Sequence, residues 1–517
     1  MQSGRYISRT RFSDPPSLTA LIDARSLPDA TVLTPDLAII GGGPAGISLA
    51  LALANSKLKI VLLESGGMNF DPKIQAMYAG DETGVRYTAL DAGRLRFMGG
   101  SSNHWGGWCR PMDDLDFEAR DWVAHSGWPI TRQTLQAYYP RAQELVEAGT
   151  WMYDQAGATM AAMAPLMQLG PGGVYTSWFQ FSKTRDSVLP TYFGHRYEQD
   201  LRAARNVTPY THANVTGIRL SPSGRNVDHL DVATLNGKHI TVKPRMVVLA
   251  CGGMENVRLL LASNDVVKPG VGNENDLVGR FFADNPIPRD VATLVVFAGS
   301  LPAYYGTNTT ISNGTILKAT FAPTIEWRRK HRVTGSLTTV DYAVELEETG
   351  RAAVVTTALA LGVDASGARA YSLGCGLELQ PDPDRRFTLA PEKDALGLPR
   401  LKLDMRVSDS DFALYRKTLT ELGRQLLASK AGMLRINYST RAQWMGALDW
   451  GNHHLGTTRM SSDPKQGVVD ADCKVHAVDN LYVAGSSVFP TYSASNPTLN
   501  LVALTLRLGD HLKKVMA

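Results

Sequence analysis

The chain has 517 residues, of which 44% are hydrophobic and 20% are charged. This composition is that of a globular protein and excludes a disordered chain. Lys and Arg number 53 against 49 for Asp and Glu, so the net charge of +4 offers no electrostatic footprint for a nucleic-acid partner. The length predicts two domains, which can be interleaved along the chain.

The cysteines and the apolar runs exclude further classes. No CxxC spacing occurs, so we expect no dithiol motif, no disulfide framework and no metal site. Residues 1–34 lack the apolar core of a secretory signal, and no run approaches 18 apolar residues. We therefore expect no membrane span and a cytoplasmic location, with periplasmic export beside a signal-bearing partner as the alternative. The four cysteines are Cys109, Cys251, Cys375 and Cys473.

The clearest structural unit lies near the start of the chain. Residues 37–40 form an apolar run with the length of a buried strand, and a glycine-rich turn follows at 41–46. An apolar helical stretch over 47–54 and a second strand over 59–64 complete the pattern. This βαβ unit has a glycine-rich first turn and an acidic residue ending its second strand, which is typical of dinucleotide-binding domains.

Two later segments repeat the combination of strand and glycine. An apolar run over 246–250 precedes two glycines and a helical stretch over 255–262, and a third run over 480–484 leads into Gly485. These units, at the start, middle and end of the chain, predict one α/β, Rossmann-like nucleotide-binding domain assembled from separated segments. Its predicted segments are 36–118, 200–300 and 445–517.

The intervening residues have a different character. Runs rich in β-branched residues at 338–344, 385–389 and 400–405 predict strands of a mainly antiparallel sheet. We expect this sheet in an α+β substrate-binding domain over 119–199 and 301–444.

Two remaining segments are less informative. Residues 1–35 are assigned to an N-terminal extension. Residues 150–175 carry Met152, Met160 and Met163 among Ala and Gly, a pattern that fits a core or surface helix and, alternatively, a mobile lid.

The three glycines of the first turn have separate physical roles. Gly41 permits the tight turn, Gly43 lets the backbone approach a pyrophosphate, and Gly46 allows the helix to pack closely on the strand. The following helix offers free N–H groups and the positive end of its dipole to phosphates. Glu64, roughly 20 residues further on, is placed to accept a ribose hydroxyl. The turn predicts a bound dinucleotide without choosing between NAD and FAD.

Three further segments resemble the glucose–methanol–choline (GMC) oxidoreductases, a flavoprotein family. They are RFMGGSSNHWGG at 96–107, HHLGTTRM at 453–460, and LYVAGSS continuing to SNPTL over 481–499. Weaker similarities to the family lie at 276–280 and 397–399. The likeness is strongest to bacterial sugar dehydrogenases and pyranose-oxidase-like members. It implies FAD as the cofactor, and an FAD-binding domain joined to the substrate-binding domain.

The resemblance also implies a catalytic pair. In the family, a base takes the hydroxyl proton of an alcohol while the carbinol hydride goes to flavin N5. The base position matches His453, with His454 as the alternative because a shift of one residue exchanges their faces. The second position matches Asn496, which is expected to orient the alcohol. Asn496 before Pro497 also has the pattern of a helix N-cap, and the two roles can coexist.

The same likeness assigns cofactor contacts. His104 matches a histidine that carries the flavin covalently in pyranose oxidases; packing beside the flavin without a bond is the favoured reading. Asn285 stands where close relatives often have a histidine, and we assign it no catalytic role. The expected cofactor-binding residues are Gly41, Gly43, Pro44, Ala45, Gly46, Glu64, Ser65, Gly100, Ser101, Asn103, His104, Val215, Gly485, Ser486, Asn496, Pro497 and Thr498.

We therefore expect an FAD-dependent enzyme that oxidises an alcohol, with a sugar, glycoside or other polyol favoured as substrate. Electrons would pass to oxygen or to an external acceptor, such as a small subunit or a cytochrome. Two alternatives remain open. One is a lyase of the same fold that keeps FAD without net redox chemistry, and the other is an oxidase of a specialised hydroxylated natural product.

Overall fold

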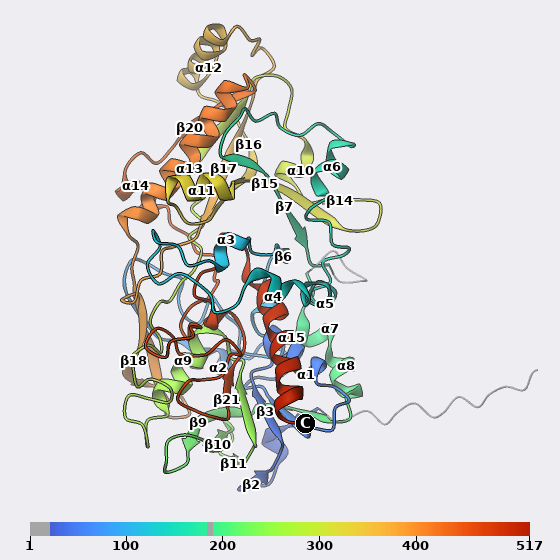
Figure 1. Cartoon of the computed structure of the whole chain (residues 1–517), viewed down its shortest axis with the longest axis vertical. Helices are drawn as coiled ribbons and strands as arrows, with labels where there is room; N and C mark the ends of the chain where they lie inside the picture. Colours follow the sequence, from blue (N-terminus) through green and yellow to red (C-terminus); the bar gives the residue numbers. More distant parts are fainter. Residues whose placement is uncertain (1–20, 184–189) are drawn as a thin grey trace, which may run out of the picture.

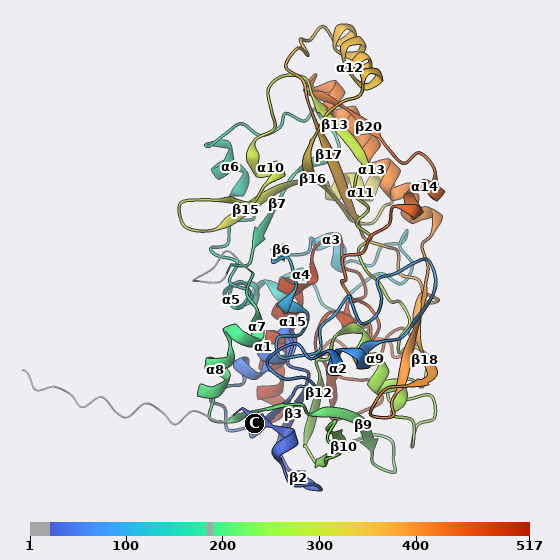
Figure 2. The ribbon, with the colours of Figure 1, turned by 180° about the vertical axis from the view of Figure 1, so that it is seen from behind.

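Four β-sheets organise the part of the chain that the computed structural model describes, residues 21–183 and 190–517. A six-stranded parallel sheet and its helices fill the lower half of the view in Figure 1. An eight-stranded antiparallel sheet fills the upper half, and the view from behind shows the same division (Figure 2). The predicted combination of an α/β part and an α+β part is therefore present.

The parallel sheet is assembled from distant parts of the chain, as predicted. Every neighbouring pair of its strands is parallel. Its central strands are short runs of Leu, Ile, Val and Ala that are buried throughout, as expected for strands covered on both faces. In spatial order the strands are β1 (Ile22–Asp23), β8 (Val207–Thr211), β4 (Ile60–Leu63), β3 (Leu37–Ile40), β12 (Met246–Leu249) and β21 (Leu481–Val483).

Three helices begin close to the carboxyl ends of these strands. Helix α1 (Pro44–Ala52) follows β3 and packs against α15 (Pro497–Val515), the long C-terminal helix. Helix α9 (Gly252–Ala262) follows β12. Ligands of open parallel sheets bind at this carboxyl edge, so the helix starts define one wall of the candidate site.

The antiparallel sheet forms the opposite wall. Helix α13 (Asp409–Ala428) lies against it, anchored by a capping box at Ser408 and Asp411. The predicted strand over 338–344 is confirmed as part of β16. The strands in order are β20 (Gly432–Ile436), β13 (Ala292–Val296), β17 (Arg369–Leu377), β16 (Ser336–Val344), β15 (Ile316–Pro323), β7 (Val174–Phe181) and β6 (Trp108–Cys109), with β14 (Thr309–Thr310) paired to β15.

One strand assignment needs correction. The runs at 385–389 and 400–405 are strands, but they do not join the antiparallel sheet of the upper half. They are β18 (Arg386–Lys393) and β19 (Pro399–Met405), which form a separate sheet with β5 (Asp81–Gly84). Both pack on α9, and Figure 2 shows β18 beside this helix. Alternation along each run identified a strand, but it carries no information about which sheet receives it.

The remaining sheet and helices complete the frame. Strands β1 and β2 place residues of the assigned N-terminal extension in two sheets. The fourth sheet contains β2 (Thr31–Leu33), β11 (His239–Val242), β10 (Val227–Ala233) and β9 (Asn214–Leu220). The other helices are α2 (Pro72–Gln75), α3 (Asp114–Phe117), α4 (Arg132–Gln136), α5 (Tyr139–Leu145), α6 (Ala156–Ala161), α7 (Phe193–Arg196), α8 (Glu198–Ala203), α10 (Ala303–Gly306), α11 (Ile325–His331), α12 (Glu348–Leu361) and α14 (Arg441–Gly446), with 3-10 turns η1 (Ala24–Ser26), η2 (Ala76–Tyr78), η3 (Gly100–Asn103) and η4 (Ser486–Val488).

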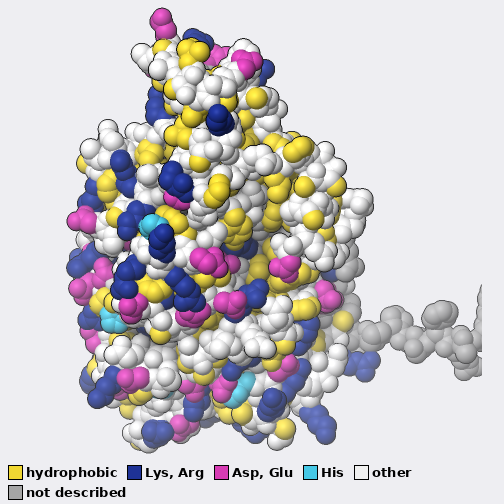
Figure 3. Space-filling model, turned by 45° about the horizontal axis from the view of Figure 1, so that its top comes forward, with side chains coloured by type: hydrophobic (Ala, Val, Ile, Leu, Met, Phe, Trp, Pro, Cys, Tyr) yellow, Lys and Arg dark blue, Asp and Glu magenta, His cyan; other side chains and the backbone are white. Residues whose placement is uncertain are grey.

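The methionine-rich stretch contributes the short helix α6, with Met152 and Met160 in the core and Met163 exposed. All four cysteines are free thiols. Within the described ranges, no helix combines the length and the apolar character needed to cross a membrane. Basic and acidic side chains are interspersed over the face seen in Figure 3, in keeping with the small net charge.

Candidate functional site

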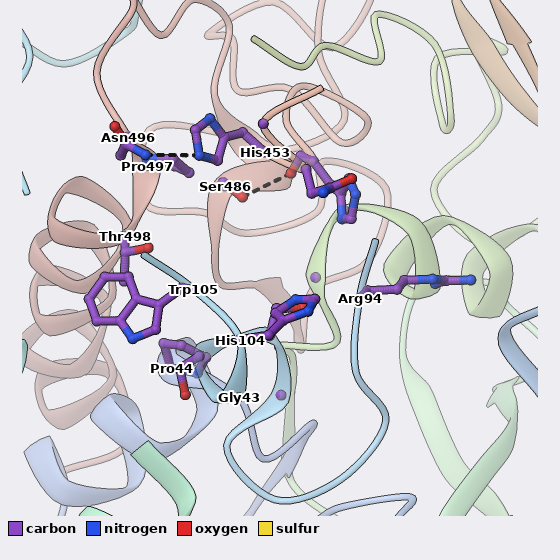
Figure 4. Close-up of a pocket in the computed structure, with 18 of the residues that line it drawn as sticks. Gly43, Pro44, Arg94, His104, Trp105, His453, Ser486, Asn496, Pro497 and Thr498 are labelled. Atoms are coloured by element: carbon purple, nitrogen blue, oxygen red, sulfur yellow. Dashed lines mark hydrogen bonds between the residues drawn. The ribbon is translucent and has the colours of Figure 1, made fainter. Parts of the chain in front are cut away.

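A cavity of about 800 Å³ lies between the carboxyl edge of the parallel sheet and the antiparallel sheet. Its walls come from the glycine turn after β3, from η3, from the start of α9 and from the start of α15. Strands β15, β16 and β17 line it from the other side. Figure 4 shows the glycine turn at Gly43 together with His453 and Asn496. One cavity therefore joins the predicted cofactor turn to the predicted catalytic pair.

The glycine turn separates into positions that the fold needs and a position that it leaves free. Gly41 has φ +106°, and a Cβ there would lie 2.6 Å from the carbonyl oxygen of Ala250. A Cβ at Gly46 would lie 1.8 Å from the oxygen of Gly41, so this glycine is required for packing. At Gly43 a Cβ would meet nothing within 4 Å. The chain thus leaves open space at the one glycine predicted to face a pyrophosphate.

Glu64 holds the turn from behind. Its Oε2 accepts a hydrogen bond from the N–H of Gly42 at 2.7 Å, and Oε1 accepts from the N–H of Gly66 at 2.8 Å. Burial raises the pKa of this carboxyl above its ordinary value. Glu64 and Ser65 both line the cavity. Each carboxylate oxygen keeps a lone pair that could accept from a ribose hydroxyl. The ribose contact itself stays a prediction.

Of the predicted site residues, only Gly46 and Asn103 do not line the cavity. Gly46 packs on Gly41, and the side-chain amide of Asn103 donates to the carbonyl oxygens of Met98 and Gly100 at 3.0 and 2.9 Å. Asn103 therefore closes the η3 turn. His104 and Trp105 follow it and line the cavity (Figure 4). The open space at Gly43, two helix starts and the volume of the cavity fit an extended dinucleotide such as FAD.

His453 and Asn496 are brought together across 43 positions of sequence. The Nε2 atom of His453 lies 3.0 Å from Nδ2 of Asn496, as the dashed line in Figure 4 marks. Asn496 occupies the N-cap position of α15, but its side chain makes no capping hydrogen bond. The side chain that could cap the helix instead contacts the imidazole. Of the two roles that the sequence left open, the helix boundary comes from the backbone and the side chain serves the site.

The tautomer of His453 follows from the residue on its other side. The Nδ2 atom of Asn285 donates to the carbonyl oxygens of Leu377 and Ser493 at 2.7 and 3.2 Å, which fixes the orientation of its amide. Its Oδ1 lies 2.8 Å from Nδ1 of His453, so Nδ1 carries the hydrogen and Nε2 presents a lone pair. Burial lowers the pKa of His453 to about 4, which keeps the ring neutral.

Asp284 holds the backbone beneath this pair. It accepts hydrogen bonds from the N–H of His453 at 2.8 Å and from the hydroxyl of Tyr87 at 2.6 Å. Burial raises the pKa of Asp284 to about 7. Asp284 was not predicted from the sequence, and Asn285 was assigned no catalytic role there. Both act through contacts about 170 positions away along the chain, and no spacing rule reports such contacts.

His454 has a different environment. Its carbonyl oxygen accepts a hydrogen bond from the hydroxyl of Ser486 at 2.9 Å (Figure 4). Its buried Nε2 makes no hydrogen bond among the described residues, and burial lowers its pKa well below the ordinary value for histidine. The structure therefore pairs His453, and not His454, with Asn496.

The chain is similar to known proteins. Residues 381–505 match the GMC oxidoreductase family. The chain is 23% identical to 2-methyl-1,2-propanediol dehydrogenase of Mycolicibacterium austroafricanum, over 93% of this chain and 95% of that protein. It is 26% identical to the fructose dehydrogenase large subunit of Gluconobacter japonicus, over 52% of this chain and 47% of that one.

A solved structure supports the fold. Pyridoxine 4-oxidase from Mesorbium loti superposes with a TM-score of 0.59 and 19% identity, covering 93% of this chain and 99% of that one. This likeness concerns the fold alone. The sequence matches confirm the resemblance drawn from the motifs and indicate an alcohol-oxidising oxidoreductase similar to the GMC enzymes.

Proposed function

We propose that the chain binds FAD non-covalently in this cavity and oxidises an alcohol to a carbonyl, with His453 as the base. The observation that carries the proposal is the fixed tautomer of His453. Asn285 occupies Nδ1, and the lone pair of Nε2 points to Asn496 at the cavity wall. A neutral imidazole whose lone pair meets only an amide donor is suited to accept a hydroxyl proton once the alcohol takes the place of that contact.

The residues that would hold FAD follow from the lining of the cavity. Gly43, Pro44 and Ala45 at the start of α1 would take the pyrophosphate, since Gly43 leaves open space and the backbone of Gly43 and Ala45 offers N–H groups. Glu64 would accept from the ribose. The start of α15, at Pro497 and Thr498, would present the positive end of a 19-residue helix to the flavin. The other proposed contacts come from Gly41, Ser65, Gly100, Ser101, His104, Val215, Gly485 and Ser486.

The protein's own part in the reaction is to orient and to move one proton. An alcohol oxygen bound beside both side chains would replace their direct contact, accept a hydrogen bond from Nδ2 of Asn496 and donate its proton to Nε2 of His453. When bound, FAD supplies the acceptor for the hydride that leaves the carbinol carbon. Asn285 would hold Nδ1–H throughout, so that the proton is taken up at Nε2 alone. The alcohol loses one proton and one hydride and becomes a carbonyl.

We favour a polyol or sugar as the substrate and an external acceptor, or oxygen, for the electrons. The named relatives act on a propanediol and on fructose, and one of them is the large subunit of an assembly. The division into an FAD-binding domain over 36–118, 200–300 and 445–517 and a substrate-binding domain over 119–199 and 301–444 stays a proposal. Strands β6 and β13 fall within the first two of these FAD-binding ranges but pair in the antiparallel sheet.

The test is product analysis with the purified yellow holoenzyme. Alcohols, diols and sugars are supplied with oxygen or with ferricyanide, and carbonyl products are identified by mass spectrometry. We expect a carbonyl product equal in amount to the acceptor consumed. Cleavage of a substrate carbon–carbon bond without consumption of acceptor would instead support a lyase, and reduction of the protein by NADPH would support a monooxygenase.

A further inference from the structure

A charged pair lines the cavity on the antiparallel sheet, away from His453 and Asn496. Lys318 lies on β15 and Asp341 on β16, and both side chains belong to the same cavity as the catalytic pair. The two strands are antiparallel neighbours in the sheet, with Phe321 paired to Thr338. Neither residue is part of a motif, and neither has a role in binding FAD or in moving the proton.

The local backbone leaves room for the side chain of Asp341. The register between β16 and β17 shifts between Val340 and Tyr342, so Asp341 is the extra residue of a β-bulge. Bulges re-aim side chains and occur often beside active sites. A Cβ on Gly374 of the next strand would lie 2.9 Å from Oδ2 of Asp341 and 2.8 Å from the hydroxyl of Thr339. Bulge and glycine together leave room for a carboxylate at the cavity wall.

The carboxylate of Asp341 can accept a further hydrogen bond. The hydroxyl of Thr339 donates to Oδ1 at 2.8 Å, while Oδ2 makes no hydrogen bond among the described residues. Leu337, Thr339 and Asp341 alternate along β16 and all line the cavity, so one face of the strand meets the substrate space.

Lys318 is a buried amine that interacts electrostatically with Asp341 but forms no ion pair with a described residue. Its residue is 8% exposed. The ammonium lies over the ring of Trp108, 5.4 Å from the ring centroid. Trp108 meets Phe179 edge-on and packs against Phe181 at a tilted angle. A cation–π contact offsets part of the cost of burial, and the amine donates no hydrogen bond to a described residue.

We propose that Lys318 and Asp341 form a substrate subsite that binds the non-reacting hydroxyl groups of a polyhydroxylated, uncharged substrate and selects it over simple alcohols. This inference rests on the proposed alcohol oxidation. A hydroxyl group can accept from the ammonium and donate to the carboxylate at the same time. A carboxylate ligand would lie against Asp341, and an ammonium ligand would lie against Lys318, so the opposed charges disfavour both.

The experiment compares D-glucose and D-sorbitol with 1-propanol and benzyl alcohol as substrates of the holoenzyme. The variants are Lys318→Met, which keeps length and removes the donors, and Asp341→Asn, which keeps shape and removes the charge. Lys402→Met, at an exposed position of β19, is the matched control. Flavin content and thermal unfolding are measured for each protein, so that a folding defect is recognised.

We expect the ratio of kcat/KM for the polyhydroxylated substrates to that for the simple alcohols to fall about 10- to 100-fold in Lys318→Met, mainly through KM. Asp341→Asn should lower the ratio in the same direction, and Lys402→Met should leave it unchanged. Gly374→Ala should lower it as well, since the added Cβ displaces the carboxylate.

Three outcomes would overturn the inference. An equal loss for both substrate classes would indicate a structural role, and an unchanged ratio would remove the subsite. Oxidation of simple alcohols alone by the wild-type enzyme would contradict the selectivity while leaving the proposed function intact. If no alcohol were oxidised at all, the proposed function itself would fail, and the inference with it.

Discussion

The two walls of the cavity meet their ligands by different means. At the edge of the parallel sheet the backbone makes the site: Gly41 and Gly46 have no room for a side chain, and Gly43 leaves open space. On the antiparallel sheet the side chains make it, with Lys318 and Asp341 on neighbouring strands. A binding site formed by close backbone approach accepts only glycine at its key positions, whereas many different side chains fit on the face of a strand. This difference explains why the first wall could be recognised from sequence and the second could not.

The largest effect is expected from a substitution in the glycine turn at the edge of the parallel sheet. Gly43→Val should fold, because its Cβ meets no protein atom within 4 Å, but it should fail to retain FAD because the branched side chain fills the phosphate space. The measurement is the flavin absorbance of the purified protein together with its thermal unfolding. Gly367→Val, at another open position, is the control and should stay yellow. A Gly43→Val protein with full flavin content would refute the placement of the pyrophosphate.

The next effect separates the two histidines at the junction of the walls. His453→Ala should lower the rate of flavin reduction by about 10²–10⁴-fold with FAD still bound, since it removes the base. Rapid mixing under anaerobic conditions gives this rate directly. His454→Ala serves as the comparison and should cost less, because His454 does not contact Asn496. A larger loss in His454→Ala would transfer the role of the base to that residue.

A smaller effect tests the residue that fixes the tautomer. Asn285→Leu removes the acceptor for Nδ1–H and lets the hydrogen move to Nε2, so the rate of flavin reduction should fall about 10- to 100-fold with a smaller change in KM. Asn285→Asp should restore much of the rate. If Asn285→Leu retained the wild-type rate, the argument from the tautomer would be wrong.

The smallest effect concerns pH. Because burial lowers the pKa of His453 to about 4, its imidazole is neutral at higher pH, and protonation removes the base only as pH falls through that value. The rate of flavin reduction should therefore be constant with respect to His453 from pH 6 upward. In Asn285→Asp the carboxylate favours the imidazolium, so the acid limb should move to higher pH. An acid limb near pH 6.5 in the wild-type enzyme would contradict the burial argument.

The features that could be predicted from the sequence differ in kind from those that could not. The βαβ unit, the separated strands of the parallel sheet and the residues around Gly43 could be predicted because short-range patterns encode them. The pairing of β19 with β5 and the contact of Asn285 with His453 depend on long-range packing, which alternation and spacing do not report. The bulge at Asp341 became visible only from the strand register.

The most direct test of the account is anaerobic addition of alcohols, diols and sugars to the yellow holoenzyme while the flavin absorbance is followed. We expect complete bleaching by at least one polyhydroxylated alcohol, with one carbonyl product formed per flavin. A flavin that stayed oxidised while the protein still converted a hydroxylated substrate would contradict hydride transfer, and with it the central claim.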